Sequence, residues 1–337
     1  MRNLDPSSTL HITNGDSAVS AMSEAGIDGT IIPWRDVLHE GPVTGDVDLE
    51  GLRPVRARFL SDIGWGKYDD ILSMMFERDA VVHRFRHYEE VVLWFEHDLY
   101  DQLQLIQILH EFAAWDPGDT KLFLVNPSEY LSLVEPQRLR ELHSKRGRIT
   151  RRQLDLGRWA WEAFGSPDPT VLARLLDGDT SPLPYLKAAL QRWFEEFPST
   201  TTGLSRSETQ ALEAIRDSAP SLADAFRAAH LEREDPLFLG DATFAIYLDR
   251  LSEGREPLIL ANDGQRIRAP KWQDDEGEKF WATQAVLTEM GQAVLAGQQD
   301  WLAVHGIDRW LGGVHLKSGG PIWRWDPMAQ RLVVTTR

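Results

Sequence analysis

The sequence predicts an α/β protein whose N-terminal part is built on a parallel β-sheet. Over residues 10–125, four short apolar runs alternate with segments that carry apolar residues at helical spacing. The run VVLWF at residues 91–95 is apolar without interruption, which is typical of a strand buried on both faces of its sheet. We therefore expect a Rossmann-like parallel sheet of at least four strands, with helices on both faces.

The predicted strands of this sheet alternate with predicted helices along the chain. The strands are predicted at residues 10–13, 29–33, 91–95 and 121–125. Helices are predicted at residues 18–25, 52–63, 68–87 and 99–114, where the apolar positions repeat at helical spacing. The first helix has Asp16 or Ser17 as its expected N-cap and Gly26 just after its end.

The rest of the chain predicts two further regions. Residues 1–147 are expected to form the sheet domain, 148–203 a helical connecting region and 204–337 a winged-helix-like domain. Ser205 and Glu208 form a capping box that opens a helix at 205–217. Helices near 221–230 and 241–251, a strand at 257–261, the stretch LTEMGQAVL and a last strand IWRWD follow. Three helices and a hairpin in this order are typical of winged-helix proteins.

Cysteine usage and apolar patterning exclude several classes of protein. The chain has no cysteine, so disulfides, thiolate metal sites and cysteine nucleophiles are excluded. No apolar run approaches the about 18 residues that a membrane span needs, and the first eight residues lack a signal-peptide pattern. The expectation is a cytoplasmic protein without a membrane partner.

The charge balance argues against nucleic acid as a partner. The net charge is −16, whereas dedicated nucleic-acid binders carry a basic face. The third helix of the winged-helix-like region and its flanks are also acidic, with Asp241, Asp249 and Glu253 against Arg250 and Arg255. A recognition helix needs basic and amide side chains that face the groove. We therefore expect this region to be structural or to bind protein rather than DNA.

Polar residues follow each of the first three predicted strands. NGDS (14–17) follows the first strand, WRDVLHEGP (34–42) the second, and EHDLYDQ (96–102) the third. Because ligands of parallel sheets bind beyond the carboxyl ends of the strands, these segments are expected to line one site. The candidate ligand-binding residues are Asn14, Gly15, Asp16, Ser17, Arg35, Asp36, Glu40, Glu96, Asp101 and Gln102.

Turn and cap chemistry accounts for part of this pattern. Asn-Gly followed by Asp or Ser is common in any tight turn from strand to helix, and acidic residues after Asp98 complement the dipole of the next helix. Capping does not explain Glu96 and His97. Arg35 fits either a two-pronged contact to phosphate or carboxylate, or a pair with Asp98 or Glu96 that neutralises a crowded edge.

The same segments contain candidates for chemistry. His39, His97 and Asp98 are the candidate catalytic residues, because imidazole and carboxyl groups serve as general acids and bases. Asp16, Asp36 and Asp98 are the candidate ligands of Mg²⁺ or another divalent cation, which binds one or two carboxylates and the phosphate oxygens of a substrate. The chain contains no GxxxxGK phosphate loop and no GxGxxG, HExxH or GxSxG motif.

Six segments resemble those of a bacterial family. HITNGDSA, WRDVLHEGPV and LWFEHDLYDQLQL are similar to the hallmark segments of a family catalogued as a domain of unknown function, number 1835 in that series. GLSRSETQALEAI, EREDPLFLGDATF and RWLGGVHL with the later WRWD resemble the C-terminal companion region of that family. The resemblance covers most of the chain, but it implies no activity.

Three functions are compatible with these observations. The first is an enzyme of hydrolase or transferase type that acts on a small phosphorylated or nucleotide-like ligand at the carboxyl edge of the sheet. The second is a regulatory protein that senses a ligand and contacts DNA or a partner through the winged helix. The third is an interaction scaffold, in which the acidic and histidine side chains pair with each other and with the backbone.

Overall fold

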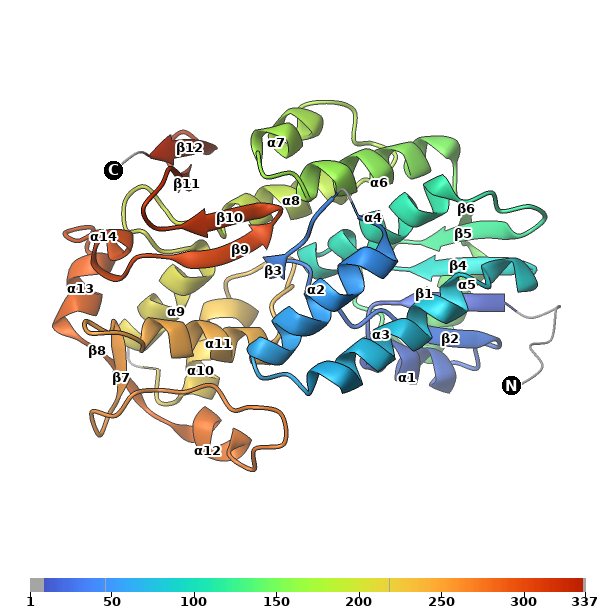
Figure 1. The fold of residues 1–337 in the computed structure, drawn as a ribbon. Helices are drawn as coiled ribbons and strands as arrows, with labels where there is room; N and C mark the ends of the chain where they lie inside the picture. The colour runs from blue at the N-terminus through green and yellow to red at the C-terminus, as the bar shows by residue number, and fades with distance from the viewer. Residues whose placement is uncertain (1–8, 46, 218, 336–337) are drawn as a thin grey trace. The chain divides into compact units, whose positions relative to one another are not determined.

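Strand β4 (Glu90–Trp94) lies in the middle of a five-stranded, mostly parallel sheet (Figure 1). The structure is a computed structural model that describes residues 9–45, 47–217 and 219–335. The strand order is β2 (Thr30–Pro33), β1 (Thr9–Thr13), β4, β5 (Lys121–Val125) and β6 (Gly147–Arg148). The predicted four-stranded parallel arrangement is confirmed, because only β6 runs antiparallel.

The register of these strands brings their carboxyl ends to one edge. Thr13 is paired with Pro33 of β2 and with Trp94 of β4, and Trp94 is paired with Val125 of β5. The segments that follow the strands therefore leave the sheet on the same side. This is the arrangement on which the predicted ligand site depends.

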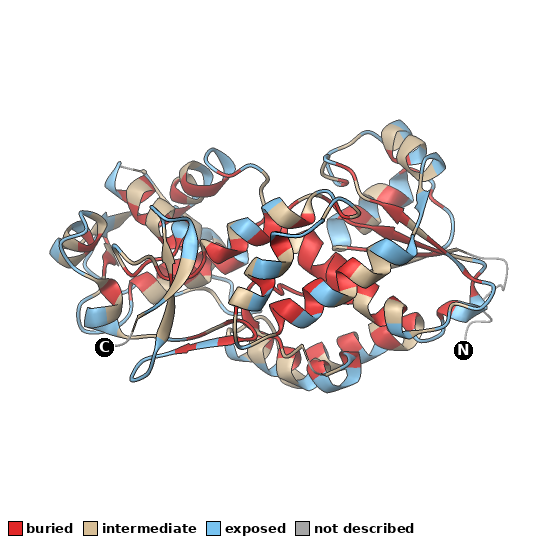
Figure 2. Cartoon of the chain, turned by 90° about the horizontal axis from the view of Figure 1, so that it is seen from above, coloured by how far each residue is buried: buried red, intermediate tan, exposed pale blue. Residues whose placement is uncertain are grey.

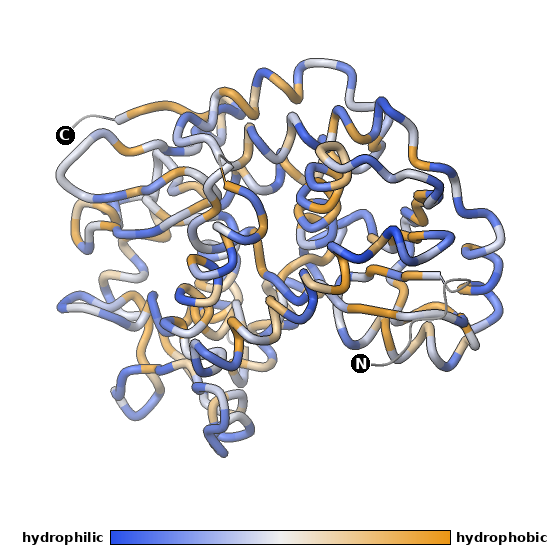
Figure 3. Tube along the Cα trace, turned by 45° about the vertical axis from the view of Figure 1, so that its right-hand side comes forward, coloured by the Kyte–Doolittle hydropathy of each residue, from blue (hydrophilic) through white to orange (hydrophobic). Residues whose placement is uncertain are grey.

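Both faces of the sheet are covered. Helices α1 (Asp16–Glu24) and α5 (Pro136–Ser144) pack on the face that carries Val92 and Trp94 of β4. Val91 and Leu93 alternate with these residues, so they point to the opposite face, and they are fully buried as well. Figure 2 shows that buried residues gather in the inner strands and helices, and Figure 3 shows that apolar and polar stretches alternate along the chain.

The start of α1 differs from the prediction. The helix begins at Asp16, its N-cap is Gly15, and no side chain caps it. The expected capping by Asp16 or Ser17 is therefore wrong. The carboxylate of Asp16 binds the guanidinium of Arg35.

Helix α4 (Leu99–Ala114) is buried on almost all sides. It packs along α6 (Arg151–Phe164), and its buried residues include the polar side chains of Gln102, Gln104 and Gln107. A helix with one apolar face would expose these residues. Here these glutamine side chains form hydrogen bonds in the interior. Gln104 donates to a main-chain carbonyl of the segment that follows β2, and Gln107 accepts from a side chain of the same segment.

The contact between α4 and α6 depends on a glycine. A Cβ atom at Gly157 of α6 would lie 2.4 Å from Cβ of Leu109 in α4. We expect Gly157→Ala to lower the free energy of unfolding by about 1–3 kcal/mol, because the two helices must move apart. Chemical denaturation measures this change. The control is Gly277→Ala at the start of α12, where a Cβ would meet nothing within 4 Å. Equal effects of the two substitutions would contradict the prediction.

The chain divides into two compact units. Unit 1 contains the described residues of 1–58, 68–189 and 312–314, and unit 2 those of 59–67, 190–311 and 315–337. In unit 1, Gly313 approaches the end of α6 so closely that a Cβ on it would lie 2.1 Å from the carbonyl oxygen of Gly165. The φ of +56° at Gly312 lies in the left-handed region, so both glycines of the Gly312-Gly313 pair are required here, one for its backbone conformation and the other for the close backbone approach.

The described residues form further helices and strands. They are β3 (Gly41–Pro42), α2 (Leu49–Asp62), α3 (Tyr68–Val82), α7 (Thr170–Leu176), α8 (Leu186–Phe194), α9 (Arg206–Arg216), α10 (Leu222–Phe226), α11 (Asp241–Leu251), β7 (Ile259–Ala261), α12 (Gly277–Ala282), β8 (Ala285–Leu287), α13 (Glu289–Leu295), α14 (Trp301–His305), β9 (Asp308–Gly312), β10 (Val314–Lys317), β11 (Ile322–Asp326) and β12 (Arg331–Thr335). Of the helices in the described part of the chain, none combines the length and apolarity required to cross a membrane.

In unit 2 the start of helix α9 agrees with the prediction, whereas the C-terminal strands differ from it. The Ser205 hydroxyl accepts from the Glu208 N–H at 3.1 Å, and the Glu208 carboxylate accepts from the Ser205 N–H at 2.8 Å, so the capping box is confirmed. The expectation that IWRWD is the last strand is wrong. The Asp326 carboxylate accepts from two N–H groups of the following turn, and the apolar run of β12 returns antiparallel to β11.

Candidate functional site

The segments after β1 and β2 are joined by main-chain hydrogen bonds. The N–H of Trp34 donates to the carbonyl of Thr13 at 2.8 Å, and the N–H of Arg35 donates to that of Asn14 at 3.2 Å. The strand order reverses nearby, since β2 lies beside β1 on one side and β5 lies beside β4 on the other. Such a reversal leaves a crevice between the carboxyl ends of β1 and β4, where ligands of open α/β sheets bind.

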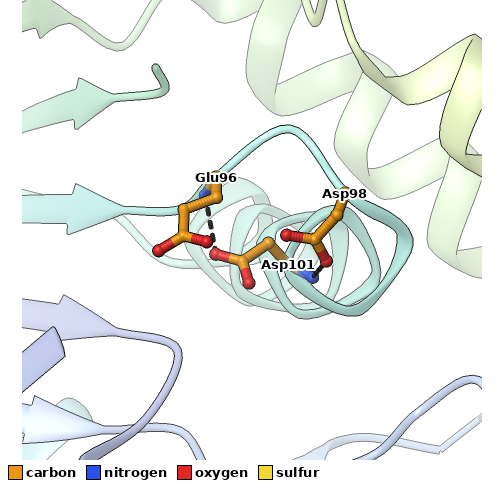
Figure 4. A group of neighbouring side chains, drawn as sticks. All are labelled: Glu96, Asp98 and Asp101. Atoms are coloured by element: carbon orange, nitrogen blue, oxygen red, sulfur yellow. Dashed lines mark hydrogen bonds between the residues drawn. The ribbon is translucent and has the colours of Figure 1, made fainter. Parts of the chain in front are cut away.

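Three carboxylates converge after β4 (Figure 4). Glu96, Asp98 and Asp101 each offer an oxygen within 4.8 Å of the others, and the residues are 4, 3 and 1% exposed. We call these three residues the acidic triad. Asp98 is the N-cap of α4 and accepts from the Asp101 N–H, while the Asp101 carboxylate accepts from the Glu96 N–H at 2.6 Å.

The charges of the acidic triad oppose one another. Burial, and then the neighbouring Asp101, raises the pKa of Glu96 to about 8. Burial raises the pKa of Asp101 to about 7, and burial together with the two neighbouring carboxylates raises that of Asp98 well above its ordinary value. Across the described ranges, no arginine or lysine forms an ion pair with these residues. Protons or a bound cation must therefore neutralise the triad.

Amide side chains surround the acidic triad. The Asn14 amide donates to Asp101 at 2.9 Å and also hydrogen-bonds Glu96. The amides of Gln102 and Asn126 both donate to the main-chain carbonyl of Glu96, at 2.6 and 3.1 Å. Their oxygens, Oε1 of Gln102 and Oδ1 of Asn126, are buried without a hydrogen-bond partner.

This set of donors fits a hard divalent cation. Carboxylate and amide oxygens are the ligands that Mg²⁺ and Ca²⁺ prefer, and a cation would replace the protons that the triad otherwise retains. Burying an amide oxygen without a hydrogen-bond partner is costly. Gln102 Oε1 is therefore a further candidate ligand atom for a cation near Glu96. The triad can therefore hold a metal ion.

Arg35, just after the end of β2, has an unusual backbone conformation. Its φ is +51°, which is uncommon for a residue other than glycine and is often found at functional sites. Its guanidinium binds both carboxylate oxygens of Asp16, and the side chains are 41 and 67% exposed. The predicted alternatives, pairing with Asp98 or Glu96, are not what the structure shows. An exposed pair of this kind contributes little stability, so Arg35 is accessible to an anion.

Asp36 has a structural partner that the sequence analysis missed. The buried guanidinium of Arg56 binds its carboxylate at 2.7 Å and donates to the carbonyls of Val37, Glu40 and Pro42. The predicted metal set of Asp16, Asp36 and Asp98 is thus not brought together, because arginines hold the first two. Of the three predicted metal ligands, only Asp98 belongs to the acidic triad. Its other two members, Glu96 and Asp101, were predicted as ligand-binding residues.

The two predicted catalytic histidines contact different aromatic side chains. His39 is buried, and its ring lies edge-on to that of Tyr100, with centroids 6.2 Å apart. His97 is half-buried and contacts the rings of Tyr130 and Tyr185. Among the other predicted residues, Glu40 is buried in the loop that Arg56 holds, while Gly15 and Ser17 lie at the start of α1.

Two comparisons with known proteins found no match. No family model matches the chain, and no curated protein is significantly similar to it. The function must therefore be inferred from the chemistry of the residues at this edge of the sheet.

Proposed function

We propose that unit 1 binds a divalent cation at Glu96, Asp98 and Asp101 and is a hydrolase or transferase that acts on a small phosphorylated or nucleotide-like ligand. The observation that carries this proposal is the position of the acidic triad. Three buried carboxylates without a basic partner lie beside the point where the strand order reverses. Mg²⁺ in such sites keeps part of its coordination for water and for substrate phosphate.

The side chains around the triad have distinct roles in this proposal. Arg35 would bind the anionic group of the ligand when it exchanges its contact with Asp16 for one with the ligand. Asn14 holds two triad carboxylates in place and connects them to the loop that carries Arg35. His97, next to Asp98 in the sequence, is our candidate general acid or base.

We also propose the finer fold assignments and the family. The order β2-β1-β4-β5 with parallel pairing supports a Rossmann-like sheet, and α9, α11 and the antiparallel β7–β8 pair support a winged-helix-like unit 2. The quoted segments support membership of the bacterial family of unknown function. A regulatory role through unit 2 is the alternative to an enzyme, and it would place the ligand at the same triad.

Calorimetric titration with Mg²⁺, Mn²⁺ and Ca²⁺ at pH 7.5 tests the cation site. We expect one cation to bind with release of protons, because Glu96 and Asp101 have pKa values of about 8 and 7. The proton count comes from repeating the titration in buffers with different ionisation enthalpies. Glu96→Gln should weaken binding by at least about tenfold.

The matched control is Glu90→Gln at the opposite end of the same strand, where the carboxylate pairs with Arg146. This variant should bind the cation as the unaltered protein does. Absence of binding in the unaltered protein, or equal loss in both variants, would refute the proposed site.

A further inference from the structure

A small cavity lies at the carboxyl end of β2, within unit 1. Its volume is about 230 Å³, and it is a half-open hollow between the end of the strand and helix α3. The apolar part of its lining comes from Ile32, Pro33, Met74, Met75 and Val81. Pockets for whole ligands usually measure about 300–1,000 Å³, so this one is suited to one ring system of a larger molecule.

One wall of the cavity is held rigidly in place. The guanidinium of Arg78 lies 3.8 Å from the ring centroid of Trp34 and donates to the carbonyl of that residue at 2.9 Å. It also binds Asp79, which is fully buried and binds Arg53 as well. These contacts fix a preformed surface of apolar and planar groups. Such a surface favours a flat aromatic ring, and methionine sulfur makes favourable contacts with aromatic rings.

Polar groups stand at the mouth of the cavity. Arg35 and Glu77 line it and are both exposed. Glu77 has no ion pair among the described residues, so its carboxylate is available to accept a hydrogen bond from an amino group of a ring. The cavity therefore combines apolar walls with a hydrogen-bonding rim, which are the properties that a nucleobase requires.

The cavity is linked to the acidic triad through the end of β1. Trp34 and Arg35 donate main-chain hydrogen bonds to Thr13 and Asn14, and the Asn14 side chain donates to Asp101. Strand β1 separates β2 from β4, so the two ends lie about 10 Å apart, or two strand spacings. This separation is similar to the distance between the base and the terminal phosphates of a nucleotide.

We propose that this cavity binds the base of a nucleoside phosphate, whose phosphate groups extend past Arg35 toward a cation at the triad. The inference rests on the proposed function, because it names the substrate class of the same site. The base would pack between Met74, Val81 and the end of β2. The phosphates would displace Asp16 from Arg35, since a phosphate group offers the same two-pronged contact with a higher charge.

Calorimetry with ATP, GTP, CTP, UTP and inorganic triphosphate, each with Ca²⁺ to prevent turnover, tests this proposal. At least one nucleotide should bind about 100-fold more tightly than triphosphate, because a base adds roughly six to nine ring atoms to the contact. Val81→Phe, which fills the cavity, should remove most of this advantage and leave triphosphate binding unchanged. Leu72→Phe is the control, since Leu72 is half-buried on the same helix and does not line the cavity.

The outcomes separate the base site from the cation site. If nucleotides and triphosphate bind equally, or if Val81→Phe keeps the nucleotide advantage, the base site is refuted while the cation site stands. If a nucleotide binds in a manner that depends on Val81 but not on divalent cation, the base site stands and the proposed function fails. If no nucleotide binds with or without cation, the base site is refuted in every form.

Discussion

Replacement of Asp98 by asparagine is expected to raise the melting temperature of the cation-free protein at pH 8 and to abolish its stabilisation by divalent cations. Asparagine removes one of the three buried carboxyl groups, which oppose one another's ionisation. It is also as good an N-cap as aspartate, so the hydrogen bond from the Asp101 N–H can be kept. A gain of about 1–2 kcal/mol would correspond to a rise of roughly 2–8 °C in a protein of this size.

The pH dependence follows from the direction of the pKa shifts. In the folded protein the pKa values of Glu96 and Asp101 are raised to about 8 and 7, above those of the unfolded chain. The folded state therefore holds more protons than the unfolded state between about pH 4.5 and 8, and stability falls as the pH rises through this range. The melting temperature of the cation-free protein should decrease from pH 5 to pH 8. Asp98→Asn should reduce this decrease.

Thermal melts at pH 5 and pH 8, with and without 5 mM Mg²⁺ as the chosen test concentration, measure both effects. Glu90→Gln again serves as the control, because its carboxylate has Arg146 as a partner. If Asp98→Asn lowers the melting temperature at pH 8 and Mg²⁺ changes neither protein, the triad is a structural cluster that retains its protons.

Replacement of Arg56 by methionine is expected to lower the free energy of unfolding by about 3–5 kcal/mol. The substitution leaves the buried carboxylate of Asp36 without a counter-charge and removes donors from three main-chain carbonyls. Denaturant unfolding at pH 7 measures the loss. The double variant Asp36→Asn with Arg56→Met should recover part of it, because the isolated charge is then absent.

The control for this prediction is Arg58→Met, two residues further along α2. Arg58 is exposed, and its guanidinium lies 4.3 Å from the ring centroid of Tyr68. Such a contact contributes about 0.5–1 kcal/mol at an exposed position. Comparable losses in the two variants would show that the pair of Arg56 and Asp36 is not what holds the loop after β2.

The sequence was sufficient to predict the sheet and the edge at which a site would lie. The four apolar runs, their spacing by helices and the polar segments after them are local patterns, and each of the four predicted strands of this sheet begins within one residue of its expected start. Glu96, Asp98 and Asp101 could be predicted as neighbours because they lie within six residues at the start of one helix. Strand β6 was missed because a two-residue strand has no periodicity.

The ion-pair partners of the acidic residues at this edge of the sheet could not be predicted from the sequence in the same way. Asp16, Asp36 and Asp98 occupy equivalent positions after three strands, yet their partners differ. Asp36 is neutralised by Arg56, an arginine on a helix 20 residues later, and Asp16 by Arg35, which has a positive φ. Such pairings depend on tertiary placement and leave no mark in the local spacing.

The chain order of unit 1 has a consequence for how the protein is made. Domains tend to fold as they emerge from the ribosome, N-terminal part first. Here residues 312–314 complete unit 1, and Val43 and Phe164 hydrogen-bond to the backbone of Gly312 and Gly313. Unit 1 therefore cannot reach its final structure until residues 190–311 have been synthesised. During that interval the end of α6 and the segment after β3 lack these partners. Unit 1 of the nascent chain is then almost but not fully folded. It must remain in this state by itself or be protected by a chaperone.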